Sequence, residues 1–181
     1  MKPIRFATVW LGGCSGCHMS LLDLDEWLLE LAAHIELVYS PIADIKHFPI
    51  DVDLTLVEGA VANVEHRELL TEVRRNSHTL VALGDCAISG NVTALRNPLG
   101  AIEPILEQIY LHHGDPGGNL PDAPAFVPKL LDRVLPIHAV VPVDLHLPGC
   151  PPPAPRIRAL LEDLIAGVEP QLEGAAMLRF G

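Results

Sequence analysis

The sequence predicts an α/β fold in which helices cover both faces of a largely parallel, five-stranded sheet. Short apolar runs alternate along the chain with amphipathic segments of helical spacing, a pattern typical of successive β–α–β units. The chain has 181 residues, of which 49% are hydrophobic, and this is enough to build one well-buried core. We find no internal repeat and no sign of a second domain. We therefore expect a single domain over residues 1–181.

Five short runs have the length and apolar composition of buried strands. They are residues 6–11, 35–39, 53–57, 79–83 and 140–145. The last run contains Pro142, which cannot donate a hydrogen bond to a neighbouring strand, so we expect this run at an edge of the sheet. A doubly wound parallel sheet of five strands favours a flavodoxin-like strand order.

Three longer segments are expected to form the helices that cover the sheet. Leucines recur at helical spacing over residues 21–31, with acidic residues toward the N-terminal end, where the helix dipole favours them. Asn63 is a suitable N-cap for a helix that continues to about Arg75. A final helix is expected over about residues 155–165.

The remaining segments are expected to be turns and short elements. Residues 112–124 are rich in glycine, proline and aspartate, and they form the one clear loop insertion. A short helix is expected after the turn at residues 89–91, and a helical turn at residues 130–134.

Composition and charge exclude some classes of function. Charged residues make up 19% of the chain, below the usual quarter, which favours a surface buried against a partner subunit; a large core is the alternative. The net charge of −11 and the lack of a basic stripe argue against nucleic-acid binding. No apolar run reaches the length of about 18 residues needed to span a bilayer, so no membrane span is expected.

The amino terminus looks only superficially like a secretory signal. Lys2 and Arg5 precede a short apolar run, residues 6–11, which is below the length of roughly 7–15 residues found in a signal peptide. No twin-arginine pair lies near the amino terminus. We therefore expect a cytoplasmic protein. In that reducing compartment, four cysteines favour metal binding over disulfides.

The cysteines follow the carboxyl ends of predicted strands. Cys14 and Cys17 lie in the glycine-rich turn after the first strand. Cys86 follows the fourth strand and Cys150 follows the fifth, while Glu58 ends the third. Parallel strands end at one edge of a sheet, where open α/β folds hold their ligands. We therefore expect all four thiols to converge on one site.

Four thiolates suit either a zinc ion or an iron–sulfur cluster. Structural zinc commonly uses two compact Cys-x-x-Cys pairs, whereas only Cys14 and Cys17 form such a pair here. We favour one iron–sulfur cluster, with a zinc-stabilised binding module as the alternative. A covalent c-type haem or a redox disulfide also fits the first pair, but both leave Cys86 and Cys150 without a role.

Two residues near these cysteines have roles that the sequence leaves open. His18 is expected in the first turn of a helix, directed at a cluster sulfur or at a partner interface. Glu58 is either an ordinary acid at a strand end or a carboxylate that carries protons or tunes the cluster. Both are candidates for contacts just outside the ligands.

Taken together, four motifs resemble the small subunit of [NiFe]-hydrogenases. They are Gly13-Cys14-Ser15-Gly16-Cys17, Val57-Glu58-Gly59, Gly84-Asp85-Cys86-Ala87-Ile88-Ser89-Gly90 and Pro148-Gly149-Cys150-Pro151-Pro152. That family holds a proximal [4Fe-4S] cluster with a Cys-x-x-Cys, a later Gly-x-Cys and a Gly-Cys-Pro-Pro on a flavodoxin-like domain. The resemblance spans about residues 6–153, and it implies that the four cysteines bind one [4Fe-4S] cluster.

Departures from the family pattern narrow the resemblance. The periplasmic members have a twin-arginine leader and six or more further cysteines for medial and distal clusters, and neither feature occurs in this sequence. The chain is therefore similar to the short cytoplasmic small subunits of NAD-reducing, bidirectional hydrogenases. The related complex I subunit has an adjacent Cys-Cys pair, and small subunits of F420-reducing hydrogenases usually carry additional cysteines. Both relatives are kept as alternatives.

The resemblance implies an electron-transfer role in hydrogen:NAD⁺ oxidoreduction. A partner large subunit would hold the Ni–Fe site that splits H₂, and a diaphorase module would carry further clusters, FMN and the NAD site. The overall reaction would be H₂ + NAD⁺ → NADH + H⁺. The resemblance also allows FMN in this chain, at the same sheet edge. A stand-alone flavodoxin-like electron carrier is a competing class, which complex formation would distinguish.

Overall fold

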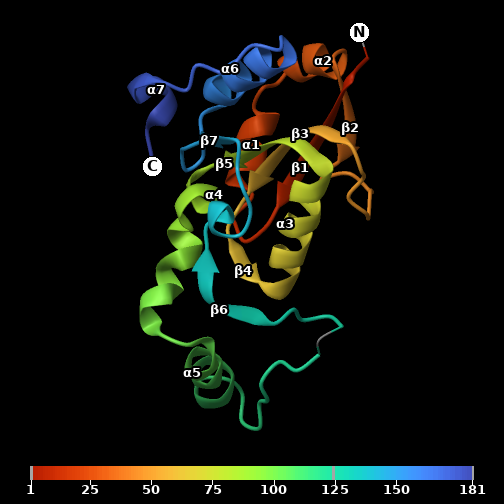
Figure 1. The fold of residues 1–181 in the computed structure, drawn as a ribbon. Helices are drawn as coiled ribbons and strands as arrows, with labels where there is room; N and C mark the ends of the chain where they lie inside the picture. The colour runs from red at the N-terminus through yellow and green to blue at the C-terminus, as the bar shows by residue number, and fades with distance from the viewer. Residues whose placement is uncertain (1, 124, 181) are drawn as a thin grey trace.

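The computed structural model describes residues 2–123 and 125–180, which form an α/β body and a projecting arm (Figure 1). Residue 124, the last of the expected insertion, and both ends of the expected domain lie outside the described residues. The body contains a five-stranded parallel sheet of order β2-β1-β3-β5-β7. Its strands are β1 (Ile4–Trp10), β2 (Ile35–Tyr39), β3 (Val52–Glu58), β5 (Ser77–Leu83) and β7 (Leu145–Leu147). The doubly wound, flavodoxin-like arrangement is confirmed.

Helices cover both faces of the sheet because side chains alternate between the faces along each strand. Phe6, Leu54 and Leu56 point into one apolar core, whereas Ala7 and Val57 point into the other. The first core is covered by α1 (Gly16–Leu22), α2 (Trp27–Ala32) and α6 (Ala154–Ile165). The second is covered mainly by α3 (Val64–Asn76).

The helix expected over residues 21–31 is broken into α1 and α2. The intervening turn, residues 23–26, includes Asp25 in a left-handed conformation with φ of 49°. The leucine spacing continues through this turn, because Leu24 in the turn packs in the same buried core as Leu21 and Leu31. The three leucines are therefore buried together even though the helix is interrupted between them.

Two expectations near the end of the chain are wrong. Residues 130–134 form strand β6 (Leu130–Leu135) rather than a helical turn, because they pair antiparallel with β4 (Val61–Asn63). The fifth sheet strand is β7, which overlaps the expected run 140–145 only at Leu145. Val141 and its neighbours instead follow a short 3₁₀ turn and pack into the second core. The last strand does lie at an edge of the sheet, although Pro142, on which that expectation rested, precedes β7 and is not part of it.

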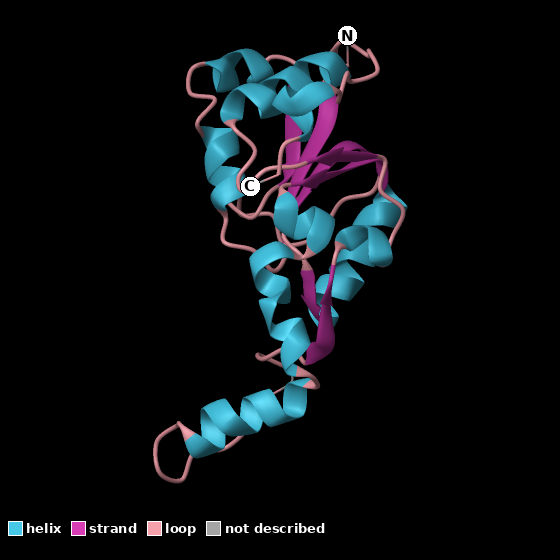
Figure 2. Cartoon of the chain, turned by 90° about the vertical axis from the view of Figure 1, so that its left-hand side faces the viewer, coloured by secondary structure: helices cyan, strands magenta, loops and turns pink. Residues whose placement is uncertain are grey.

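The arm extends away from the five-stranded sheet (Figures 1 and 2). It contains the 3₁₀ helix η1 (Asn91–Leu99), α5 (Ile102–Glu107) with its π-helical continuation η2 (Gln108–His112), and β6. The short helix expected after residues 89–91 corresponds to η1, and α4 (Asp85–Ser89) precedes it. Residues 113–123 of the expected insertion contain no helix or strand. Of the helices that the structure describes, none is long and apolar enough to cross a membrane.

Candidate metal centre

Four strands of the sheet end at the same level, and this brings the cysteine-bearing turns together. Trp10 pairs with Glu58, Glu58 pairs with Leu83, and Leu83 pairs with Leu147. These residues are the last of β1, β3, β5 and β7. The turns that carry the cysteines therefore leave the sheet from one row of residues, as the sequence predicted from strand ends.

The turn after β1 and the turn after β5 are in direct contact. Gly84 has a φ of 82°, and a Cβ placed on it would overlap the sulfur of Cys17. A Cβ on Gly16 would lie 3.3 Å from the sulfur of Cys14. Glycine at these two positions leaves room for the sulfurs, and at Gly84 it also permits the left-handed backbone.

Asp85 joins the turn that carries Cys86 to the turn that carries Cys150. The backbone N–H of Asp85 donates to the carbonyl of Gly149 at 2.9 Å, and the N–H of Gly149 donates to Asp85 Oδ1 at 2.6 Å. The Asp85 side chain is buried, so this reciprocal pair is shielded from water. Hydrogen bonds to a charged acceptor are stronger than neutral ones, and this fixes the two turns relative to each other.

Glu58 and His18 form a second buried connection, between the end of β3 and the first turn of α1. Glu58 Oε2 accepts from the backbone N–H of His18 at 2.8 Å and lies 2.5 Å from His18 Nδ1. Both residues are at most 4% exposed. The carboxylate satisfies an otherwise free N–H at the start of the helix, directly after Cys17. The sequence placed both residues near the cysteines, and the structure shows that they contact each other.

The four thiols differ in exposure but interact electrostatically. Cys17 is buried, Cys86 is half-buried, and Cys14 and Cys150 are exposed. Burial raises the pKa of the Cys17 thiol strongly, and the charges of Glu58 and of the other three cysteines raise it further. Burial also raises the pKa of Cys86, with a smaller contribution from Cys150 and Cys14. The four sulfurs therefore share one electrostatic environment at this edge.

The donor set matches the chemistry of an iron–sulfur cluster, since soft thiolates from four cysteines are its usual ligands. Among the described residues, no three His, Cys, Asp or Glu side chains are arranged to hold a single metal ion. A [4Fe-4S] cluster does not require such an arrangement, because each of its thiolates binds a different iron. All four cysteines are free thiols.

Two residues near the site were missed by sequence reasoning. Asn91 Nδ2 donates to the sulfur of Cys150 at 3.3 Å, although the sequence indicated only a turn here. Arg156 is buried and donates through Nη1 to the carbonyl of Pro148 at 2.6 Å, which supports the backbone before Cys150. Neither contact has a sequence signal, because each depends on how distant segments pack.

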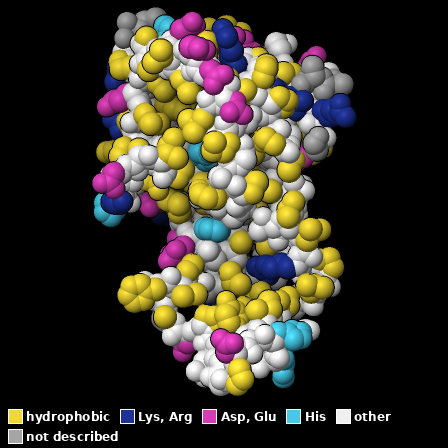
Figure 3. All heavy atoms as spheres, turned by 180° about the vertical axis from the view of Figure 1, so that it is seen from behind, with side chains coloured by type: hydrophobic (Ala, Val, Ile, Leu, Met, Phe, Trp, Pro, Cys, Tyr) yellow, Lys and Arg dark blue, Asp and Glu magenta, His cyan; other side chains and the backbone are white. Residues whose placement is uncertain are grey.

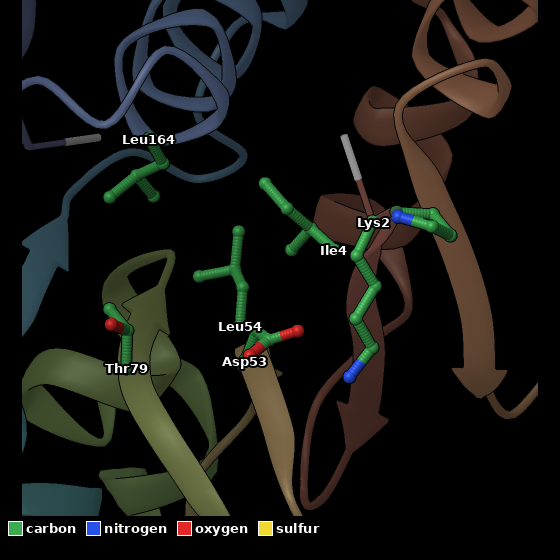
Figure 4. A pocket seen from close by; sticks show the side chains of 7 residues that line it. Lys2, Ile4, Asp53, Leu54, Thr79 and Leu164 are labelled. Carbon is green, nitrogen blue, oxygen red and sulfur yellow. The ribbon is translucent and has the colours of Figure 1, made fainter.

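Cavities elsewhere lack this chemistry. A cavity of about 350 Å³ lies at the opposite edge of the sheet, near the amino ends of β1 and β3 (Figure 4). Its labelled side chains include Lys2, Asp53 and Thr79, and no cysteine lines it. A second cavity of about 240 Å³ lies between β1, β2, α1 and α2 and is almost entirely apolar, with His18 in its wall.

The family model described as NADH ubiquinone oxidoreductase, 20 Kd subunit, matches residues 14–164, a range that contains all four cysteines. The chain belongs to this family. Within it, the chain is similar to subunits of hydrogenases, so the resemblance that the cysteine motifs indicated is confirmed.

Three relatives illustrate this similarity. A chain in the crystal structure of an NAD⁺-reducing [NiFe]-hydrogenase in the H₂-reduced state is 43% identical, with a TM-score of 0.93 over 99% of this chain and 100% of that one. The delta subunit of the NAD-reducing hydrogenase HoxS from Cupriavidus necator is 38% identical over 91% of this chain and 79% of its own length. A subunit of the F420-non-reducing hydrogenase vhu from Methanococcus voltae is 39% identical over 93% of this chain.

The relatives differ in how much of their length is matched. The chain spans 58% of the Methanococcus voltae protein and between 56% and 58% of three further subunits of F420-non-reducing hydrogenases. These subunits therefore contain a large part that this chain does not match.

Proposed function

We propose that this chain is the electron-transfer small subunit of an NAD-reducing [NiFe]-hydrogenase. It carries one [4Fe-4S] cluster bound by Cys14, Cys17, Cys86 and Cys150. The observation that carries the proposal is that these cysteines follow the carboxyl ends of three strands, β1, β5 and β7, at one edge of the sheet. The structural relative with a TM-score of 0.93 is a chain of an NAD⁺-reducing [NiFe]-hydrogenase, which supports this member of the family over a complex I subunit or an F420-linked one.

The bound cluster supplies one-electron transfer, and this chain's residues hold it and adjust its surroundings. Glu58 fixes the turn after Cys17, while Asp85 fixes the spacing between the turns of Cys86 and Cys150. Cys14 and Cys150 are exposed residues, so partners that exchange electrons with the cluster would approach on their side of the edge.

The proposed partners follow from this role. A large subunit with the Ni–Fe site delivers the electrons of H₂, and diaphorase subunits with further clusters, FMN and the NAD site receive them, giving H₂ + NAD⁺ → NADH + H⁺. FMN bound in this chain at the same sheet edge is part of the proposal. The cytoplasm is the proposed location, because NAD⁺ is the proposed electron acceptor.

We also propose that residues 1–181 form one domain, with residues 112–124 as a loop insertion. The pairing of β4 with β6 supports this, since β4 lies between β3 and α3 of the body and β6 belongs to the arm. Thermal unfolding with a single cooperative transition is the expected result, and two separate transitions would contradict it.

Metal content tests the ligand assignment. In an anaerobically purified dimer of the large and small subunits, we expect about four irons and four sulfides beyond the Ni–Fe centre, with at most traces of zinc. Reduction with dithionite should produce the EPR signal of a reduced cluster. Stoichiometric zinc without sulfide would instead support the zinc-stabilised binding module and exclude the electron-transfer role.

Single replacements by serine test each ligand. Serine at position 14, 17, 86 or 150 should abolish H₂-driven NAD⁺ reduction and remove or alter the EPR signal, because a hydroxyl is a poor ligand for iron in such a cluster. Thr71→Ser, on the exposed side of α3, is a matched control that should behave like the wild type. Full activity in any of the four cysteine variants would contradict the assignment.

A further inference from the structure

Asn91 occupies an unusual position next to the candidate metal centre. It is the first residue of η1, directly after the glycine that ends α4. Its side-chain Nδ2 lies 3.3 Å from the sulfur of Cys150, 59 residues away in sequence, and donates a hydrogen bond to it. Cys150 is exposed, so this contact lies on the side of the cluster site that faces outward.

The backbone at Asn91 adopts a conformation that most residues avoid. Its φ is 36°, in the left-handed region, and only four non-glycine residues of the described chain have a positive φ. Asparagine tolerates this region better than most side chains, but the conformation is still unfavourable. Strain of this kind is kept where surrounding contacts require it, and here Asn91 contacts a proposed ligand of the cluster.

The same segment contains a second donor near a cysteine. Burial raises the pKa of the Cys86 thiol, and the Thr93 side chain and, to a smaller extent, the backbone N–H of Val92 partly offset this effect. The hydroxyl of Thr93 donates to the carbonyl of Gly12 at 3.0 Å, which ties η1 to the turn before Cys14. Together with the contact of Asn91 to Cys150, these contacts connect the start of η1 to all three segments that carry the cysteines.

A hydrogen bond to a ligand sulfur changes the energy of the two redox states unequally. The reduced cluster carries one more negative charge than the oxidised one, and part of that charge lies on the sulfurs. A donor at a sulfur therefore stabilises the reduced state more and raises the reduction potential.

We propose that Asn91 helps to set the reduction potential of the cluster by donating a hydrogen bond to the sulfur of Cys150. This inference rests on the proposed [4Fe-4S] cluster and deepens it. Asn91 acts through a ligand rather than as one. Removal of its donor stabilises the oxidised cluster relative to the one-electron reduced cluster.

Two substitutions separate the effect of the Asn91 side-chain donor from the effect of the backbone conformation at this position. Asn91→Gly removes the side chain and accepts the left-handed conformation without strain. Asn91→Asp keeps the shape of the side chain but replaces the donor by a negatively charged acceptor. The expected order of midpoint potentials is wild type, then Asn91→Gly, then Asn91→Asp, from highest to lowest.

A matched control lies on the same helix. Asn97 Nδ2 donates to the carbonyl of Val134 at 2.9 Å, and Asn97 Oδ1 accepts from the N–H of Val134 at 2.8 Å. It supports η1, and within the described part of the chain its side chain donates no hydrogen bond to a cysteine. Asn97→Gly should lower thermal stability and leave the midpoint potential of the cluster unchanged.

The measurement is a redox titration of the anaerobically purified large–small subunit dimer, followed by the EPR signal of the reduced cluster. At the wild-type midpoint, Asn91→Gly should show about a tenfold lower ratio of reduced to oxidised cluster. For a one-electron couple this corresponds to a shift of about 59 mV to more negative potential.

The possible outcomes distinguish this inference from the function it rests on. A wild-type dimer without iron and sulfide contradicts the proposed function itself. A wild-type dimer with the expected signal, but with the same midpoint in Asn91→Gly or an equal shift in Asn97→Gly, overturns only the role of Asn91. Loss of the cluster in both Asn91 variants overturns it too, because Asn91 is then needed for binding rather than for the potential.

Discussion

At the scale of single residues, the candidate centre depends on the glycines and the aspartate next to the cysteines as much as on the cysteines themselves. Gly84 and Gly16 leave the space that the sulfurs of Cys17 and Cys14 approach. Asp85 contributes both a backbone donor and a side-chain acceptor to the turn before Cys150. The sulfurs are therefore positioned by neighbours from other turns rather than by their own loops alone.

Replacing Gly84 by alanine should prevent cluster binding. The new Cβ would overlap the Cys17 sulfur, and the positive φ, in a region that essentially only glycine adopts, would add about 1–3 kcal/mol of strain. Gly100→Ala is the control, because Gly100 also has a positive φ of 101° but has no atom within 4 Å of its Cβ position. Iron content of the purified dimer should fall only for Gly84→Ala. Similar iron content in the two variants would show that the steric contact is unimportant.

At the scale of elements, the short strand β7 matters most because it carries the turn with Cys150. It contains three residues and is held at its start by Asp144. The N–H of Asp144 donates to the carbonyl of Leu80 at 3.0 Å, and its Oδ2 accepts from the N–H of Leu80 at 2.7 Å and from Arg74 Nη1 at 2.6 Å. One carboxylate thus connects β7 with β5 and α3.

Asp144→Ala should loosen β7 and weaken retention of the cluster. Loss of the acceptor removes the part-buried hydrogen bond from the N–H of Leu80 and the exposed ion pair with Arg74, with a cost of about 1–2 kcal/mol in the free energy of unfolding. Asn63→Ala is a matched control, since it removes the N-cap of α3, where Asn63 Oδ1 accepts from the N–H of His66, at a cost of about 1 kcal/mol. Iron loss to a chelator should be faster only in Asp144→Ala, and equal rates in the two variants would argue against the role of β7.

The start of α3 also predicts a dependence of stability on pH. Burial lowers the pKa of His66, whose Nδ1 accepts from the N–H of Ala62 at 3.3 Å. The folded chain therefore favours neutral His66, and this stabilisation is complete above the ordinary histidine pKa of about 6.5. It is lost as the pH falls below that value toward the lower pKa of the folded state, because the unfolded chain then binds the proton more readily.

Urea unfolding between pH 8 and pH 5 tests this dependence. The wild type should lose stability as the pH falls, and His66→Gln should show a smaller decrease over the same range, because glutamine does not titrate. An identical pH profile in both proteins would show that His66 does not contribute.

At the scale of the whole molecule, the arm carries much of the exposed apolar surface (Figure 3). Leu95, Leu99 and Phe126 are 72%, 69% and 88% exposed. Extended apolar patches are uncommon on proteins that act alone. The low fraction of charged residues in the sequence is consistent with a surface that a partner covers.

Expressed without its partners, the chain should therefore be poorly soluble or self-associate. Leu95→Ser combined with Phe126→Ser should reduce this self-association, which light scattering can measure at equal protein concentrations. Lys46→Ser, on an exposed side chain of the body, is a control that should leave self-association unchanged. A monodisperse wild-type monomer would argue against a partner-covered surface.

The sequence alone determined the body of the fold and the place of the cysteines. Apolar runs and turn residues predicted β1, β2, β3 and β5 closely, because the burial of a parallel strand is encoded in its own residues. The position of each cysteine after a strand then predicted a common site, since parallel strands share one carboxyl edge.

Only the tertiary structure decided how distant segments meet. Residues 130–134 became a strand because β4 offers a partner for their backbone groups, and no local pattern encodes that partner. No local pattern encodes the hydrogen bond between Asp85 and Gly149 or the one that Asn91 donates to Cys150. Each contact joins residues that are far apart in the chain. The local sequence sets which groups are available, whereas the packing of the sheet and its turns selects their partners.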